Sequence, residues 1–239
     1  MSEGHGSVVK NIILGIIIGA ALVASAWILS GGFKSIAKPD RIVSVKGLAE
    51  REVDADLAIW PMSFSFGEDN IQTLQQKIIN KTAIAKTYLL KYGLTESDFT
   101  VQAPAITDTS LENFHSTQPK YQYVAKEVIL VRSDKIAAVK NAQEHSLELM
   151  GDDILVSQDF DGRVVYEFTH LNSIKPDMIG EATKNARVAA EQFARDSGSS
   201  VGKILRAAQG GFSIEDAATG LEEKKKVRVV TTVDYFLID

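Results

Sequence analysis

The sequence contains no cysteine, which excludes disulfide bonds, thiolate metal ligands and thiol nucleophiles together. It also has no excess of positive charge, because 26 lysine and arginine residues stand against 31 aspartate and glutamate residues. Binding to nucleic-acid phosphates needs a clustered positive field, so nucleic acid is not an expected partner. A third absence is local: the segment 11–33 has no charged side chain in 23 residues. This last absence points to a lipid bilayer.

The uncharged segment 11–33 is long enough to cross a membrane as a helix. At about 1.5 Å per residue it spans the roughly 30 Å hydrocarbon core of a bilayer. Lys10 and Lys34 flank the segment, and Trp27 can lie at the level of the lipid headgroups. The sequence therefore predicts an N-terminal tail, a transmembrane anchor in contact with lipid and a polar linker, at residues 1–10, 11–33 and 34–40.

Small residues follow one face of this predicted anchor. Gly15 and Gly19 form a small-xxx-small pair, and Ala20 and Ala24 continue it. Such a face lets two helices approach closely in lipid, so Gly15 and Gly19 are candidate helix–helix contact residues. The alternative is that they only reflect the general abundance of glycine in membrane helices.

A cleaved secretory signal is the alternative to a retained anchor. Ala24-Ser25-Ala26 has the A-x-A pattern of a cleavage site, which would release a secreted body after Ala26. However, apolar residues continue through Trp27, Ile28 and Leu29, and the whole stretch is too long for the apolar region of a signal peptide. Length therefore favours the anchor.

Residues 41–239 have the pattern of one α+β domain. Strands arrive in adjacent pairs with helices between them, which predicts a mainly antiparallel sheet with helices packed on it. An alternative is two subdomains that share a continuous sheet. The predicted helices are 68–92, 134–150 and 175–196. The predicted strands are 42–45, 53–66, 99–107, 121–131, 154–160, 163–168, 204–209 and 227–238.

Several local expectations follow from the periodicity. Alternation in the second strand places the apolar set inward, and Pro61 in that strand suggests an edge or a bulge. Gly47 predicts a break between the first two strands, Asp161-Gly162 a hairpin turn, and 210–226 a polar loop. The many alanines of helix 175–196 predict close packing on a sheet or a partner. The inward sets are Ala58, Trp60, Met62, Phe64 and Phe66 in the strand, and Met178, Ala182, Ala186, Ala189, Ala190 and Phe193 in the helix.

No motif in the body predicts catalysis, a cofactor or a metal site. The histidines, which are His5, His115, His145 and His170, lack metal-ligand spacing. Asp159 to Gly162 has only part of a calcium loop, and Gly198 to Lys203 follows a helix where a phosphate loop would precede one. Glu222 to Lys226 predicts a solvated turn, or alternatively an intersubunit charge contact. We therefore expect a protein that is not an enzyme.

Four parts of the body resemble the SIMPL-domain family. Val43 to Gly47 with Ala55-Asp56-Leu57-Ala58 is similar to its opening strand pair, although Ala55 stands where proline is usual. Gly93-Leu94 and Asp98-Phe99 are similar to its helix stop and next strand. The sharpest resemblance is in 175–206, where an alanine-rich helix leads into Gly198 and Val201-Gly202-Lys203-Ile204. The closing strand over Val229 to Phe236 also fits.

This resemblance implies a bacterial envelope protein, usually exported, with no catalytic residues to transfer. It also implies links to stress tolerance and to ring-like homo-oligomers. The basic residues after the anchor argue against export of the body, so the expected orientation, with the body in the periplasm and the anchor in the inner membrane, rests on the resemblance. We expect a tethered scaffold that self-associates. The alternative is a binding module for a peptide, unfolded client or envelope ligand, with the loop 108–120 as its contact surface.

Overall fold

The computed structural model describes residues 14–27, 41–111, 120–159 and 162–239. The chain divides into two compact units. The first unit comprises Met1–Val45, Arg187–Ala207 and Val233–Asp239, and the second comprises Lys46–Ala186 and Ala208–Thr232.

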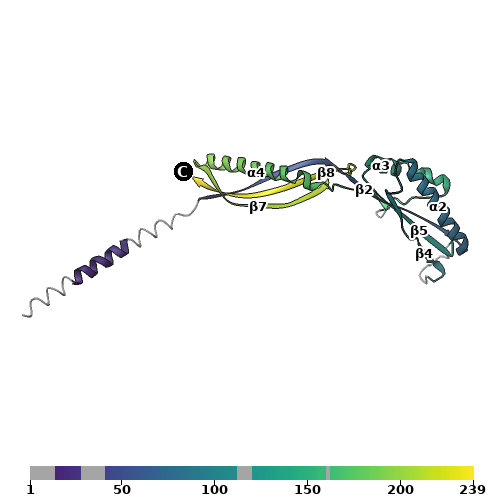
Figure 1. Cartoon of the computed structure of the whole chain (residues 1–239), viewed down its shortest axis with the longest axis horizontal. Coiled ribbons are helices and arrows are strands. Elements are labelled where there is room, and N and C mark those ends of the chain that lie inside the picture. The colour runs from purple at the N-terminus through teal and green to yellow at the C-terminus, as the bar shows by residue number, and fades with distance from the viewer. Residues whose placement is uncertain (1–13, 28–40, 112–119, 160–161) are drawn as a thin grey trace, which may run out of the picture. The chain divides into compact units, whose positions relative to one another are not determined.

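The elements confirm an α+β protein with antiparallel strand pairing (Figure 1). The strands are β1 (Ile42–Asp54), β2 (Leu57–Glu68), β3 (Phe99–Val101), β4 (Ala105–Asp108), β5 (Tyr123–Ser133), β6 (Val165–Glu167), β7 (Ser200–Asp216) and β8 (Lys224–Ile238). The helices include α2 (Ile71–Lys91), α3 (Ile136–Glu144) and α4 (Leu171–Asp196), with 3-10 turns η1 (Thr109–Leu111) and η2 (Ser146–Asp152). The strands form two sheets, ordered β1-β8-β7 and β3-β5-β2-β6, with β4 also paired to β5.

The predicted anchor lies only partly within the described residues. Residues 14–27 are helical, whereas 11–13 and 28–33 lie outside the described ranges. Among the helices of the described residues, none combines the length and the apolarity needed to cross a membrane.

The five-stranded sheet builds the main core of the second unit. β2 pairs with β5 along its whole length, so that Trp60 lies opposite Val131 and Met62 opposite Ile129. These side chains are fully buried, which confirms the inward face predicted from alternation. α2 and α3 lie on one side of this sheet (Figure 1). They contribute further core side chains, including Ala85, Tyr88, Leu89, Val139 and Ala142.

Helix α2 begins and ends where capping chemistry dictates. The Asn70 side chain accepts hydrogen bonds from the backbone N–H groups of Gln72 and Thr73, at 2.9 and 3.1 Å. At the other end Gly93 has φ +88°, a conformation that side-chain-bearing residues rarely adopt. The predicted stop at Gly93 is therefore confirmed, and the helix starts slightly later than expected.

Pro61 occupies a place on β2 where a missing donor does no harm. The Ser63 carbonyl accepts from Ser157 N–H at 2.8 Å, so residues of odd number turn their backbone groups away from β5. On that side the pairing with β6 stops at Ile59, and the next contact is an isolated bridge between Phe64 and Val156. Pro61 faces the gap between them, which agrees with the predicted edge position.

Helix α4 packs directly on the three-stranded sheet. In the second unit Met178 and Ala182 are fully buried with Ala49, Val227 and Val229. Ala186 and Ala190 are also buried, so the predicted close packing of the alanine face is confirmed. Phe193, however, is 60 % exposed, and Ala189 is only half-buried, so their assignment to the buried face is wrong.

Several predicted boundaries are wrong for physical reasons. β1 continues through Gly47 because the glycine accommodates α4 instead of breaking the strand. The expected helix 134–150 changes to η2 after Glu144. Of the expected strand 154–160, the described residues 154–159 contain only the bridge at Val156, while residue 160 and the turn residue Asp161 lie outside the described ranges.

The expected loop 210–226 is largely strand. β7 continues to Asp216 and β8 starts at Lys224. Lys225 is buried and forms an ion pair with Asp216, while Lys224 pairs with Asp54. Because neighbouring strands supply the counter-charges, Lys224 to Lys226 form part of the sheet, whereas Glu222 and Glu223 lie in the expected turn. The glycines in β7 also permit close approach, since a Cβ on Gly210 would lie 2.9 Å from the Val230 carbonyl oxygen.

The described part of the first unit contains the beginning of β1 and the end of β8. Leu237 N–H donates to the Arg41 carbonyl at 2.7 Å, and the Arg41 guanidinium pairs with Asp239. Gly202 at the start of β7 lies against the Phe236 carbonyl and the Ile238 side chain. Strands β1, β8 and β7 therefore remain close-packed in this unit too.

Candidate functional site

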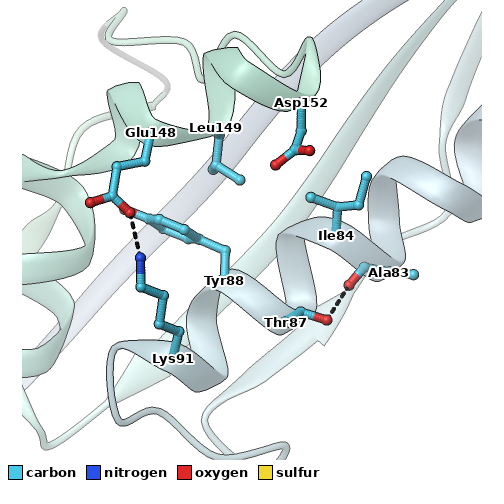
Figure 2. A pocket seen from close by; sticks show the side chains of 8 residues that line it. All are labelled: Ala83, Ile84, Thr87, Tyr88, Lys91, Glu148, Leu149 and Asp152. Carbon is cyan, nitrogen blue, oxygen red and sulfur yellow. Dashed lines mark hydrogen bonds and ion pairs between the residues drawn. The ribbon is translucent and has the colours of Figure 1, made fainter.

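A groove of about 420 Å³ lies between α2 and η2 in the second unit. Leu149 and Asp152 point from η2 toward α2, and Ile84 and Tyr88 point back from α2 (Figure 2). The remaining lining residues are Ala83, Thr87, Lys91 and Glu148. The groove therefore has an apolar floor with charged groups at its rim.

Three side chains from one face of α2 hold the opposite wall in place. Lys81 is buried, and its ammonium donates to the carbonyl oxygens of Asp152 and Asp153 at 3.0 and 2.7 Å. The Tyr88 hydroxyl donates to the Ala142 carbonyl at 2.5 Å, and Lys91 forms an ion pair with Glu148 at 2.7 Å. The spacing of seven and three residues places these groups on the same side of the helix. The groove is thus preformed.

The charges at the rim are unequal. The hydrogen bond from Lys91, followed by that from Tyr92, lowers the pKa of Glu148, so this carboxylate is ionised and matched by a cation. Burial raises the pKa of Tyr88, so its hydroxyl stays protonated and continues to donate to Ala142. Among the described residues, none donates a hydrogen bond to the Asp152 side chain. The nearby Lys81 ammonium forms an ion pair with the Asp153 carboxylate at 3.8 Å, so among the described residues Asp152 adds one uncompensated negative charge to the groove.

This arrangement suits recognition better than acid–base chemistry. Its tyrosine is protonated and engaged, and its one lysine is matched by a carboxylate. Nowhere in the described ranges do three His, Asp or Glu side chains gather as they would to bind a metal ion.

The residues that carry the family resemblance serve the fold. A Cβ on Gly47 would lie 1.8 Å from the Ala182 carbonyl oxygen and 2.4 Å from the Ala186 nitrogen. No side chain fits there, because real Cβ contacts do not fall below 3.0 Å. Gly47 and the alanines of α4 are therefore two halves of one close contact between helix and strand.

Asp56 connects the turn between β1 and β2 to the start of α4. Its carboxylate accepts from the backbone N–H groups of Thr169 and His170 at 2.8 and 3.1 Å, and its Oδ2 lies 2.5 Å from the His170 ring. Burial would raise the pKa of Asp56, but the bonds from Thr169 and His170 outweigh it and lower that pKa. The carboxylate thus fixes the two residues that lead into α4, a helix that is distant in sequence.

Asp98 connects the loop between α2 and β3 to the end of β5. Its carboxylate accepts from Thr95, Ser133 and Lys135 at 2.7 to 2.8 Å. Burial alone would raise the pKa of Asp98, but these donors, led by Lys135, hold the pKa well below its usual range. With its hydrogen bonds already satisfied, this carboxylate has a structural role.

The predicted contact residues of the anchor are both described. Gly15 and Gly19 lie in helix 14–27, and a Cβ added to either would have no heavy atom within 4 Å. Their predicted role in helix pairing stays a prediction. Of the candidate contact loop 108–120, residues 112–119 lie outside the described ranges, while Leu111 is strongly exposed.

The remaining sequence candidates are dispersed. His145 Nδ1 lies 2.9 Å from the Asn141 carbonyl oxygen, His170 contacts Asp56, and His5 and His115 are outside the described residues. Gly198 ends α4 with φ +67°, and Ser199 N–H donates to the Ala194 carbonyl, as in a helix stop. This agrees with rejecting a phosphate loop there.

Sequence reasoning missed the buried carboxyl of Glu127. The residue is 1 % exposed in β5, opposite Phe64, and neither carboxyl oxygen has a hydrogen-bond partner among the described residues. Burial raises its pKa. Alternation could have revealed it, because Glu127 takes the inward position between Ala125 and Ile129.

Comparison with known protein families assigns residues 43–235 to SIMPL, described as a protein of unknown function (DUF541). The chain belongs to the SIMPL family. A comparison with curated proteins gave no match. The family assignment confirms the resemblance seen in the sequence and assigns no activity.

Proposed function

We propose that this chain is a non-enzymatic, membrane-tethered envelope protein that self-associates through the edge strand β7. The uncharged segment 11–33 supports the tether, because its length matches the hydrocarbon core of a bilayer. In this proposal the tail lies in the cytoplasm, the anchor in the inner membrane and the body in the periplasm. Cleavage after Ala26 would instead release a periplasmic body. A contribution to stress tolerance belongs to the same proposal and rests on family resemblance.

The observation that carries self-association is the exposure of β7. This strand is 17 residues long and lies at the end of the order β1-β8-β7, so one side of it pairs with no described strand. Successive side chains in a strand point to opposite faces of the sheet. Ile204 and Leu205 are 50 % and 47 % exposed, so both faces of β7 are open at this point. A long edge with free backbone groups and exposed apolar residues is a template for a further strand.

The charges along β7 favour another β7 as that strand. Lys203 and Arg206 lie in its first half, and Glu215 and Asp216 lie at its end. When two copies pair antiparallel with Gln209 opposite Gln209, Lys203 of each copy lies opposite Glu215 of the other, on the same face of the sheet. Opposite charges across an antiparallel pair stabilise it. The contact is self-complementary, and a twofold axis relates the two copies.

Tethering strengthens such a contact. Chains held in one membrane meet at a higher effective concentration than free chains, so weak strand pairing becomes significant. Pairing of β7 with the opposite edge β1 of a neighbour would instead be head-to-tail and could close a ring.

The test is charge reversal, read as the mass of the full chain in mild detergent. Lys203→Glu alone and Glu215→Lys alone each place like charges opposite one another, so we expect the dimer dissociation constant to rise roughly tenfold or more. The double variant restores opposite charges and should restore the dimer. Arg187→Glu makes the same charge change on α4 and is the matched control.

The outcomes separate the alternatives. A monomeric native chain at all concentrations contradicts self-association. If the single variants weaken assembly and the double variant does not restore it, the twofold β7 contact is contradicted. That result favours the β1–β7 ring.

A further inference from the structure

We propose that the groove between α2 and η2 binds an extended peptide segment in which a lysine stands beside apolar residues. The site is distinct from β7 and does not depend on self-association. Its chemistry follows from its apolar floor and from its single uncompensated carboxylate at Asp152.

The floor selects an aliphatic group. Ile84 and Leu149 face one another across the groove, and the Tyr88 ring lies between the walls (Figure 2). The polar tip of Tyr88 is already bonded to Ala142, so the ring offers the ligand chiefly its apolar surface. A cavity of about 420 Å³ lies within the size range of ligand pockets and accommodates amino-acid side chains.

The rim selects a cation. Glu148 and Lys91 neutralise one another at 2.7 Å, which leaves Asp152 as the carboxylate free to accept a donor from a ligand. A lysine side chain matches both features, because its methylene stem packs on apolar surface while its ammonium stays at the rim. An acidic ligand would instead face the uncompensated charge.

The surroundings favour a peptide over a free amine. Ile79 is a large apolar side chain that is 58 % exposed, and it lies one turn of α2 before the lining residue Ala83. It offers a peptide's neighbouring residue additional apolar contact that a lone alkylammonium ion could not use. The hydrogen bonds of Lys81 and Tyr88 and the ion pair of Lys91 hold the groove open before a ligand binds. A preformed site lowers the entropic cost of binding.

The probe is a blocked leucyl-lysyl-leucine peptide with a C-terminal fluorophore, titrated with the full chain in mild detergent and followed by anisotropy. We expect saturable binding and at least tenfold weaker binding of the same peptide with glutamate in place of lysine. Asp152→Asn should weaken binding of the lysine peptide about tenfold, the loss of one charge-assisted hydrogen bond. Asp134→Asn removes an equal charge from an exposed site outside the groove and should leave binding unchanged.

A second variant guards against a local folding defect at Asp152. Thr87→Lys places an ammonium on the groove wall, and we expect it to compete with the lysine peptide while thermal unfolding stays as in the native chain. Equal binding of the lysine and glutamate peptides would overturn the proposal. So would undiminished binding of the lysine peptide to both Asp152→Asn and Thr87→Lys. Free ethylamine competing as strongly as the peptide would overturn its peptide character.

Discussion

Strands β5 and β7 show opposite departures from ordinary burial. β5 is paired on both sides, by β2 and by β3 and β4, and it buries the carboxyl of Glu127, which no described residue hydrogen-bonds. β7 pairs only with β8 among the described strands, and it exposes Ile204 and Leu205. The neighbours of a strand, more than its own residues, therefore decide what is buried. The exposed apolar side chains of β7 indicate that a neighbouring strand is missing. The buried carboxyl of β5 indicates a local loss of stability that the fold tolerates.

The largest expected effect comes from the same truncation in both strands. Ile129→Ala in β5 should lower the free energy of unfolding by about 4 kcal/mol, because the side chain is fully buried. Ile204→Ala in β7 should change it by about 0.5 kcal/mol or less in the dissociated chain. Urea unfolding of both variants measures the difference. A comparable loss at Ile204 would mean that β7 is covered within a single chain.

A pair of glycines extends the comparison to the two edge strands of one sheet. Gly47→Ala in β1 should destabilise by about 3 kcal/mol, because the new Cβ would collide with the backbone of α4. In β7, the new Cβ of Gly211→Ala would have no described heavy atom within 4 Å. This substitution should be neutral or stabilise the chain by about 0.5 kcal/mol. Thermal unfolding, measured at protein concentrations too low for the chain to associate, provides the readout. Equal effects would contradict the close contact between α4 and β1.

The smallest expected effect concerns Glu127 and depends on pH. Its pKa is raised by burial, so the folded state retains a proton that the unfolded state releases above about pH 4.3. The stability of the native chain should therefore fall as pH rises from that value toward the folded-state pKa. Glu127→Leu should remove this slope and stabilise the chain at neutral pH by roughly 1–3 kcal/mol. Urea unfolding between pH 4 and 8 tests it, with Glu181→Leu at an exposed position of α4 as control.

Much of the fold follows from local pattern. The inward set around Trp60 and Met62, the stop at Gly93 and the buried alanines of α4 were predictable because each depends on periodicity or on one residue's conformational freedom. The extent of β7 was not predictable, since a strand exposed on both faces has no alternation. Lys225 looked like part of a solvated turn because its counter-charge, Asp216, lies on another strand.

The candidate groove could not be found from sequence. Its walls come from α2 and η2, which β3, β4, β5 and α3 separate along the chain. The contacts that fix it, such as that of Lys81 with the carbonyl of Asp153, involve backbone atoms that no side-chain pattern reveals. Gly47, Asp56 and Asp98 were recognisable as family residues, but their roles in packing and capping required the structure.

The position of Trp60 has a practical consequence. The chain has two tryptophans, and Trp27 lies in helix 14–27 with its side chain exposed, whereas Trp60 is fully enclosed by the core of the five-stranded sheet. Replacing Trp27 by phenylalanine would leave a single indole, whose emission shifts to longer wavelength when water enters that core. The protein thus contains its own optical probe, which reports on β2 and its neighbours and is blind to events confined to β7.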